Sequence, residues 1–228
     1  MKTVSVFRLT GPRSNSKQAR LLVVLLWAAL LMSVLAQAAL AQADAFCGEF
    51  TGRGLDYTNA QLRSQHLGVV ERVHFTEDVR TLRRGATGYL VSDIEYVLNW
   101  FPNHHGALDA LARLAVREGT THPNRARADI ECRFRWARQA QPRDAMVPVI
   151  RGIYYQRLGR YSDAREQFLA ASNLDPENPE VHYNLGLALV RLGDYDNARI
   201  HAAEAYGRGY PLPGLRNLLS RAGHPLDD

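Results

Sequence analysis

The C-terminal half of this 228-residue chain repeats itself at a spacing of 34 residues. Eight positions keep the same amino acid at that offset: Gly152/Gly186, Arg157/Arg191, Leu158/Leu192, Gly159/Gly193, Tyr161/Tyr195, Ala164/Ala198, Arg165/Arg199 and Ala171/Ala205. A fixed period of this length is typical of repeat proteins, whose units are too small to bury a core alone and pack against their neighbours. Two units are too few for a continuous core, so the sequence predicts further helices around them.

The repeated positions resemble the tetratricopeptide repeat (TPR), a helix-turn-helix family whose pattern includes L-G-x2-Y, then A-x3-F, then proline. The first unit has Gly152-x2-Tyr155, Ala164-x3-Phe168 and Pro176, and the second has Leu185-Gly186-x2-Leu189, Ala198-x3-Ala202 and, one place late, Pro211. Pro148 and His182 occupy the usual tryptophan position, and Arg151 stands where leucine is usual. We therefore expect the first helix of the first unit to begin late. The resemblance implies an all-α, right-handed α-solenoid.

The resemblance also implies roles for single residues. Gly152 and Ala164 are expected to face each other where the two helices of a unit cross, with Tyr155 and Phe168 filling the space around them. Glycine after Arg-Leu is expected to end each first helix, since glycine accepts the left-handed conformation of a C-cap. The repeat-defining set is Gly152, Tyr155, Ala164, Phe168, Ala171, Pro176, Gly186, Ala198 and Ala205.

Further helices are expected on both sides of the two repeats. Helices are predicted at 91–101, 107–117 and 128–141, and a terminal helix at 214–222, while Thr76 is expected as the N-cap of a short helix. The resulting segments are 1–43, a signal peptide or uncleaved anchor; 44–88, a partly helical extension; 89–144, degenerate TPR-like helices; 145–178 and 179–212, the two repeats; and 213–228, a capping helix and tail.

Residues 1–43 have the layout of a secretory signal peptide: a basic start, an apolar run and an A-x-A site at Ala41-Gln42-Ala43. We expect cleavage after Ala43, or else after Ala41, and export to the periplasm. The alternative is an inner-membrane anchor at 21–41 facing the periplasm. Five of the 28 basic residues lie before residue 21, which leaves 23 against 23 acidic residues. The remainder therefore has no basic excess for nucleic acid.

The chain contains two cysteines, Cys47 and Cys132. In an oxidising compartment we expect them to form a disulfide, which would close a loop of roughly 85 residues and contribute about 4 kcal/mol. Two unrelated buried thiols are the alternative. Cys47-Gly48, His74-Phe75-Thr76 and the run 101–105 also resemble features of small secreted proteobacterial TPR proteins, a group without an established activity.

In the TPR family the first helices line a concave groove where peptides bind. Carried onto this sequence, the lining positions are Met146, Val149, Ile150, Ile153, Arg157, Tyr183, Asn184, Leu187, Val190 and Arg191. This set of apolar, aromatic and arginine side chains includes the tyrosine and arginine that are enriched at interface hot spots. The alternative is that several of them only pack against adjacent helices. The paired basic residues of known carboxylate clamps are not recognisable.

The sequence gives weaker evidence for catalytic or metal-binding residues. His104 and His105 are adjacent, and neighbouring side chains on a helix point about 100° apart, so capping and packing are favoured over chelation. Asn103 is expected to cap the helix. The arginine-rich run 125–138 is expected to be a solvated helix face. Since no catalytic motif occurs, we expect a scaffold or adaptor for a protein or peptide, without enzymatic activity, cofactor or metal.

Three alternatives are left open. One is an envelope enzyme with a site in the segment 44–90, which contains Glu49, Asp56, His66, Glu71 and His74. Another is a structural subunit held in the membrane by the leader. The third is self-association, since an uncapped repeat end can stack on a copy of itself.

Overall fold

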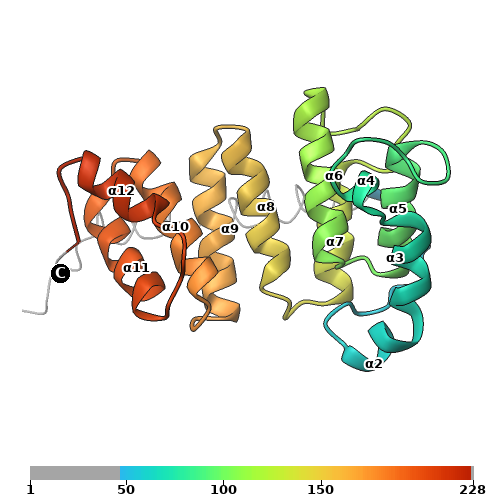
Figure 1. Ribbon diagram of the computed structural model, residues 1–228, viewed down its shortest axis with the longest axis horizontal. Helices are drawn as coiled ribbons and strands as arrows, with labels where there is room; N and C mark the ends of the chain where they lie inside the picture. The colour runs from blue at the N-terminus through green and yellow to red at the C-terminus, as the bar shows by residue number, and fades with distance from the viewer. Residues whose placement is uncertain (1–46, 227–228) are drawn as a thin grey trace, which may run out of the picture. The chain divides into compact units, whose positions relative to one another are not determined.

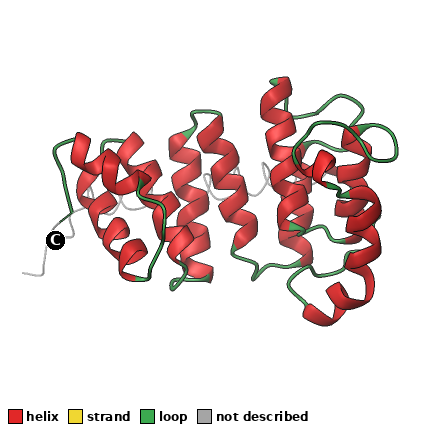
Figure 2. Cartoon of the chain, viewed as in Figure 1, coloured by secondary structure: helices red, strands yellow, loops and turns green. Residues whose placement is uncertain are grey.

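The computed structural model describes residues 47–226, in which the regular secondary structure is helical (Figures 1 and 2). The expected signal peptide and its cleavage sites lie outside these residues. In chain order the elements are α2 (Ala60–Leu62), the π-helical segment η1 (Arg63–Leu67), α3 (Gly68–His74), α4 (Glu77–Arg80), α5 (Leu90–Trp100), α6 (His105–Glu118), α7 (Ile130–Ala140), α8 (Met146–Arg157), α9 (Tyr161–Leu174), α10 (Pro179–Arg191), α11 (Tyr195–Gly207) and α12 (Gly214–Arg221).

The described residues from Glu49 onward form one compact unit, built from packed helices. The two TPR-like pairs are α8 with α9 and α10 with α11, and α10 also packs on α9. The pair α6 and α7 packs on α8, and α12 packs on both α10 and α11 (Figure 1). The helices expected at 91–101, 107–117, 128–141 and 214–222 thus correspond to α5, α6, α7 and α12. They supply the neighbours that two repeats need to bury their cores.

The repeated glycines end α8 and α10 as expected. Gly159 and Gly193 have φ angles of 74° and 77°. The backbone N–H of Arg160 donates to the carbonyl of Tyr155 over 2.9 Å, and that of Asp194 donates to Leu189 over 3.0 Å. These are the six-to-one hydrogen bonds of a Schellman motif, which satisfies the last carbonyls of a helix. Each glycine therefore sets the turn into the second helix of its repeat.

Two local expectations are wrong, and a third, the N-cap at Thr76, is correct in position. The helix α8 does not begin late, since its first residue, Met146, is the counterpart of position 180, next to the start of α10 at Pro179. Thr76 occupies the N-cap position of α4 but makes no side-chain capping hydrogen bond. The N-cap of α6 is His104 rather than Asn103: the Nδ1 atom of His104 accepts a hydrogen bond from the N–H of Ala107 over 3.0 Å.

The two repeat glycines lie at tight helix contacts. A Cβ atom added at Gly152 would lie 2.5 Å from Cε1 of Phe168, the nearest atom, so that ring fills the space beside the glycine, as expected. At Gly186 the nearest atom would be Cδ2 of Leu215 in α12, also at 2.5 Å, and the backbone oxygen of Ala198, the expected alanine, would lie at 3.5 Å. Phe168 and Leu215 are fully buried. Glycine therefore lets the core of each repeat close.

The arginine-rich run is only partly solvated. Arg133 is buried in α7, where its guanidinium lies 2.8 Å from the Glu95 carboxylate of α5. The exposed fractions of the two side chains are 4% and 3%. Arg133 also donates to Oδ1 of Asn99, and the Glu95 carboxylate accepts from the backbone N–H of Arg127. A buried ion pair with these additional hydrogen bonds therefore joins α5 to α7.

Both cysteines are disulfide-bonded. Since the sequence contains Cys47 and Cys132 alone, the bond joins these two residues, as predicted. Within residues 47–226, none of the helices combines the length and the apolar character that a membrane span requires.

Candidate partner-binding groove

Part of the predicted groove is an open pocket of about 320 Å³ between α8, α10 and the ends of α9 and α12. Its lining side chains are Ile153, Gln156, Arg157, Tyr161, Leu187, Arg191 and Leu218. Ile153 and Arg157 lie one turn apart on α8, and the 34-residue offset places Leu187 and Arg191 at the same positions of α10. The repeat itself therefore brings two apolar side chains and two arginines to one surface.

The two arginines have different electrostatic surroundings. Nη1 of Arg157 lies 2.8 Å from Oδ1 of Asp109, a carboxylate that also contacts Arg113 over 2.8 Å. The charge of Arg157 is thus partly compensated from α6. The guanidinium carbon of Arg191 lies 5.9 Å from the ring centre of Tyr161, a cation–π contact. Among the described residues Arg191 has no carboxylate partner. The groove therefore combines an apolar floor with one uncompensated positive charge.

The ten residues predicted to line the groove separate into three groups. Ile153, Arg157, Leu187 and Arg191 line the pocket. Val149, Ile150, Tyr183 and Asn184 are buried, and Val190 is half-buried beside the core. Met146, also half-buried, lines a different pocket, near the start of α6. The buried members contact neighbouring helices and offer a partner little surface, as the packing alternative describes.

The side chain of Asn184 is hydrogen-bonded within its own helix, α10. Its side-chain amide donates to the backbone carbonyl of Glu180 over 2.9 Å, and its own backbone carbonyl accepts from Nε2 of Gln156. Sequence reasoning missed Gln156, Tyr161 and Leu218 as groove residues. Tyr161 begins α9 and Leu218 belongs to α12, so neither lies on a first helix of a repeat. The 34-residue identity of Tyr161 with Tyr195 was the available signal for one of them.

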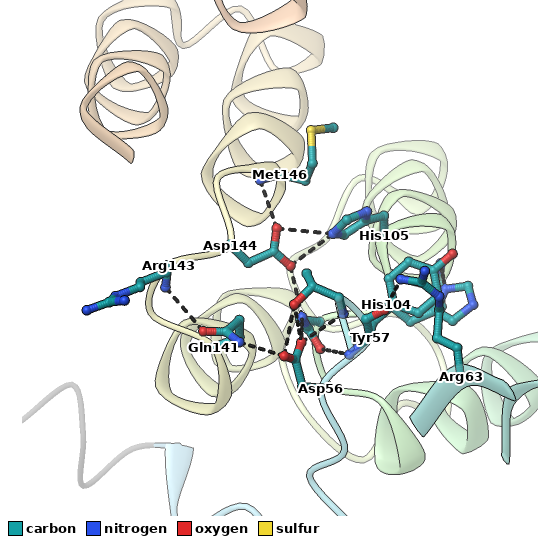
Figure 3. Close-up of polar contacts among 12 residues, drawn as sticks. Asp56, Tyr57, Arg63, His104, His105, Gln141, Arg143, Asp144 and Met146 are labelled. Carbon is teal, nitrogen blue, oxygen red and sulfur yellow. Dashed lines mark hydrogen bonds and ion pairs between the residues drawn. The ribbon is translucent and has the colours of Figure 1, made fainter. Parts of the chain in front are cut away.

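Away from the groove, a cluster of polar side chains surrounds the start of α6 and joins it to the N-terminal extension (Figure 3). Nε2 of His105 lies 2.9 Å from Oδ2 of the buried Asp144, in the loop before α8. The amide of Asn103 donates to Asp144 over 2.9 Å and to Asp56 over 3.0 Å, and Gln141 also donates to Asp56. Burial raises the pKa of Asp56, but hydrogen bonds from Thr58, Asn103 and Gln141 outweigh it and hold that pKa below its ordinary value.

The titratable residues considered for an enzyme do not converge on one site. The Glu71 carboxylate lies 3.0 Å from Nε2 of His104, and Nδ1 of His74 lies 2.8 Å from the Asp93 carboxylate. The ring of His66 lies beside Trp100 instead. Within residues 47–226 no group of three or more His, Cys, Asp or Glu side chains has a metal-binding arrangement. These pairs link helices to each other, and this structural role accounts for their geometry.

Asp93 gives a pH-dependent prediction. Its buried carboxylate accepts hydrogen bonds from the Thr87 hydroxyl over 2.6 Å and from the N–H of Ala86 over 2.7 Å, besides its contact with His74. Burial raises the pKa of Asp93, but these hydrogen bonds outweigh it, so its pKa lies below 3.8. Unfolded Asp93 thus binds a proton at higher pH than folded Asp93, and stability falls as the pH falls.

We expect the contribution of Asp93 to the free energy of unfolding to be fully present above the unfolded pKa near 3.8. This contribution is lost as the pH falls through the lower pKa of the folded state. Asp93→Asn is expected to be less stable than the unmodified protein at neutral pH and to lose less stability on acidification. Urea unfolding at a series of pH values measures both effects. Parallel curves for the two proteins would contradict the assignment.

Comparisons with known proteins agree with the repeat. Residues 153–193 match the family model described as TPR repeat. No curated protein matches the chain. Among solved structures, PilF of Pseudomonas aeruginosa is 19% identical; the match covers 72% of this chain and 70% of that one, with a TM-score of 0.49. TTC0263, a thermophilic TPR protein of Thermus thermophilus, is also 19% identical, with 71% and 77% covered and a TM-score of 0.44.

The matched residues 153–193 run from the middle of α8 through α9 to the end of α10. This segment contains one complete second helix, one complete first helix and both glycines of positive φ that end the first helices. Gly152, whose added Cβ atom would meet Phe168, lies one residue before this segment. Residues 153–193 are thus a tetratricopeptide-repeat segment, set in a chain whose other described elements are also helical.

Proposed function

We propose that this chain is an exported adaptor whose groove between α8 and α10 binds an extended peptide or a helix of a partner protein. The observation that carries the proposal is the convergence of equivalent positions of two repeats, Ile153 with Leu187 and Arg157 with Arg191, on one open pocket. The pocket also contains Tyr161 and two arginines, and tyrosine and arginine are enriched at interface hot spots. Arg191 has no carboxylate partner among the described residues, which favours a partner segment with an acidic or carbonyl-rich face.

A site-specific photocrosslinker tests the groove. The probe replaces Arg191 in the full chain, expressed in cells, and a matched probe replaces Leu169, an exposed residue of α9 outside the groove. We expect a defined protein to be captured from position 191 and not from position 169. Equal capture from both positions would contradict a groove-specific partner.

The captured segment then allows a binding measurement. We expect Leu187→Glu to weaken binding of the corresponding peptide at least tenfold, since it places an unpaired charge on the apolar floor, and a tenfold loss corresponds to about 1.4 kcal/mol. Leu169→Glu is the control and should leave the affinity unchanged, as measured by fluorescence anisotropy. An unchanged affinity for Leu187→Glu in a protein with an unchanged circular dichroism spectrum would refute the groove.

Export rests on the leader sequence and is supported by the disulfide, since disulfides persist in oxidising compartments. Mass spectrometry of the purified protein is expected to find Asp44 as the first residue, from cleavage after Ala43. A protein that retains residues 21–41 and remains in the membrane fraction would favour the anchored alternative.

A further inference from the structure

A second open surface lies on α11, away from the proposed groove. Its pocket of about 650 Å³ is lined by α11, by Arg216 of α12 and by Leu226. Ile200, at its centre, is 59% exposed. The position 34 residues earlier, on the corresponding helix α9, is Glu166. The later repeat therefore has an exposed apolar residue where the earlier one is charged.

The rest of this face allows another helix to approach. Ala203 follows Ile200 by one turn, and Gly207 follows Ala203 by another turn on the same side. A Cβ atom added at Gly207 would meet nothing within 4 Å. Small residues beside one large apolar residue can receive the equivalent large residue of a second helix. Apolar side chains buried in this way leave water together, which favours association.

Asp196 and Arg216, at the two ends of the pocket, carry opposite charges, and Arg199, next to Ile200, also lines it. Asp196 is exposed near the beginning of α11, and its carboxylate has no ion pair or hydrogen bond with another described residue. Arg216 lies at the other end, with its guanidinium carbon 4.7 Å from the ring centre of Tyr206. Its backbone N–H also donates to the Tyr206 hydroxyl over 3.0 Å. Arg216 is thus held in place while its charge has no carboxylate partner among the described residues.

We propose that this face binds the same face of a second copy of the chain, with the two α11 helices antiparallel about a two-fold axis. An axis between positions 200 and 203 sets Ile200 of each copy opposite Ala203 of the other. The same symmetry sets Asp196 of each copy opposite position 207 of the other, next to Tyr206 and Arg216. A two-fold interface must be self-complementary, and a patch with a central apolar residue and opposite charges at its ends meets that requirement.

Sedimentation equilibrium of the purified full-length gene product tests the proposal. We expect a monomer–dimer equilibrium with a Kd between about 10⁻⁶ and 10⁻⁴ M. Ile200→Glu should raise the Kd at least tenfold, since it brings a charge to the apolar centre. Leu169→Glu, a matched change at an exposed apolar residue of α9, should leave the Kd unchanged.

A charge exchange separates this geometry from other modes of association. Asp196→Arg and Arg216→Asp should each raise the Kd, and the double variant should restore the unmodified value, because the cross-copy pairs form again with reversed signs. A protein that remains monomeric throughout the concentration range overturns the proposal. Open-ended filaments, an unchanged Kd for Ile200→Glu or a double variant as weak as the single variants would overturn it too. None of these results depends on the groove between α8 and α10.

Discussion

Replacing Gly152 with leucine is expected to lower the free energy of unfolding by about 3 kcal/mol, the upper part of the usual range for overpacking a core. The Cβ atom alone would lie 2.5, 2.7 and 2.8 Å from three ring atoms of Phe168, and that ring is fully buried. The ring cannot move without displacing α9 from α8. Urea unfolding followed by circular dichroism at 222 nm measures the loss.

The matched control is Gly68→Leu. Gly68 has a helical φ of −60°, and its added Cβ atom would meet nothing within 4 Å. Since leucine has the higher helix propensity, the control should leave stability unchanged or raise it by less than about 1 kcal/mol. Gly186→Leu should cost less than Gly152→Leu, because the nearest atom there is the end of the Leu215 side chain, which can rotate, on the short helix α12. Equal losses at positions 68 and 152 would contradict the packing of α8 on α9.

Replacing Arg133 with methionine is expected to lower the free energy of unfolding by about 3 to 5 kcal/mol, the usual cost of leaving one member of a buried ion pair without its partner. The pair is almost fully buried, so water cannot replace the guanidinium beside Glu95. Arg133 also holds Asn99 through a hydrogen bond of 2.9 Å, which would be lost as well. Chemical denaturation of the single variant measures the effect.

A double-mutant cycle identifies the cause of that loss. Glu95→Gln removes the negative charge and keeps an oxygen that can accept from the N–H of Arg127. The variant with both Arg133→Met and Glu95→Gln should therefore be more stable than Arg133→Met alone. Strictly additive losses would indicate that Arg133 acts by its volume and not by its charge. An exposed arginine of the same run, Arg138, provides the control, since Arg138→Met should change stability by less than about 0.5 kcal/mol.

The sequence alone determined the helical repeat and where its helices end. A period of 34 residues and the glycines that follow Arg-Leu are local signals, because helix geometry and the left-handed C-cap depend on neighbouring residues. Gly159 and Gly193 have the expected positive φ. The same offset correctly aligned Ile153 with Leu187 and Arg157 with Arg191, so part of the groove was predictable.

Only the tertiary structure decided which distant side chains meet. Leu215 of α12 meets Gly186, and the buried Arg133 of α7 pairs with Glu95, 38 positions earlier, on α5. Likewise Leu218 joins the groove because α12 packs on α10 and α11. A helical sequence specifies which side chains share a face, but the angle and depth at which two helices pack depend on all side chains between them. That is why residues with similar local patterns became a core contact, an ion pair or an open surface.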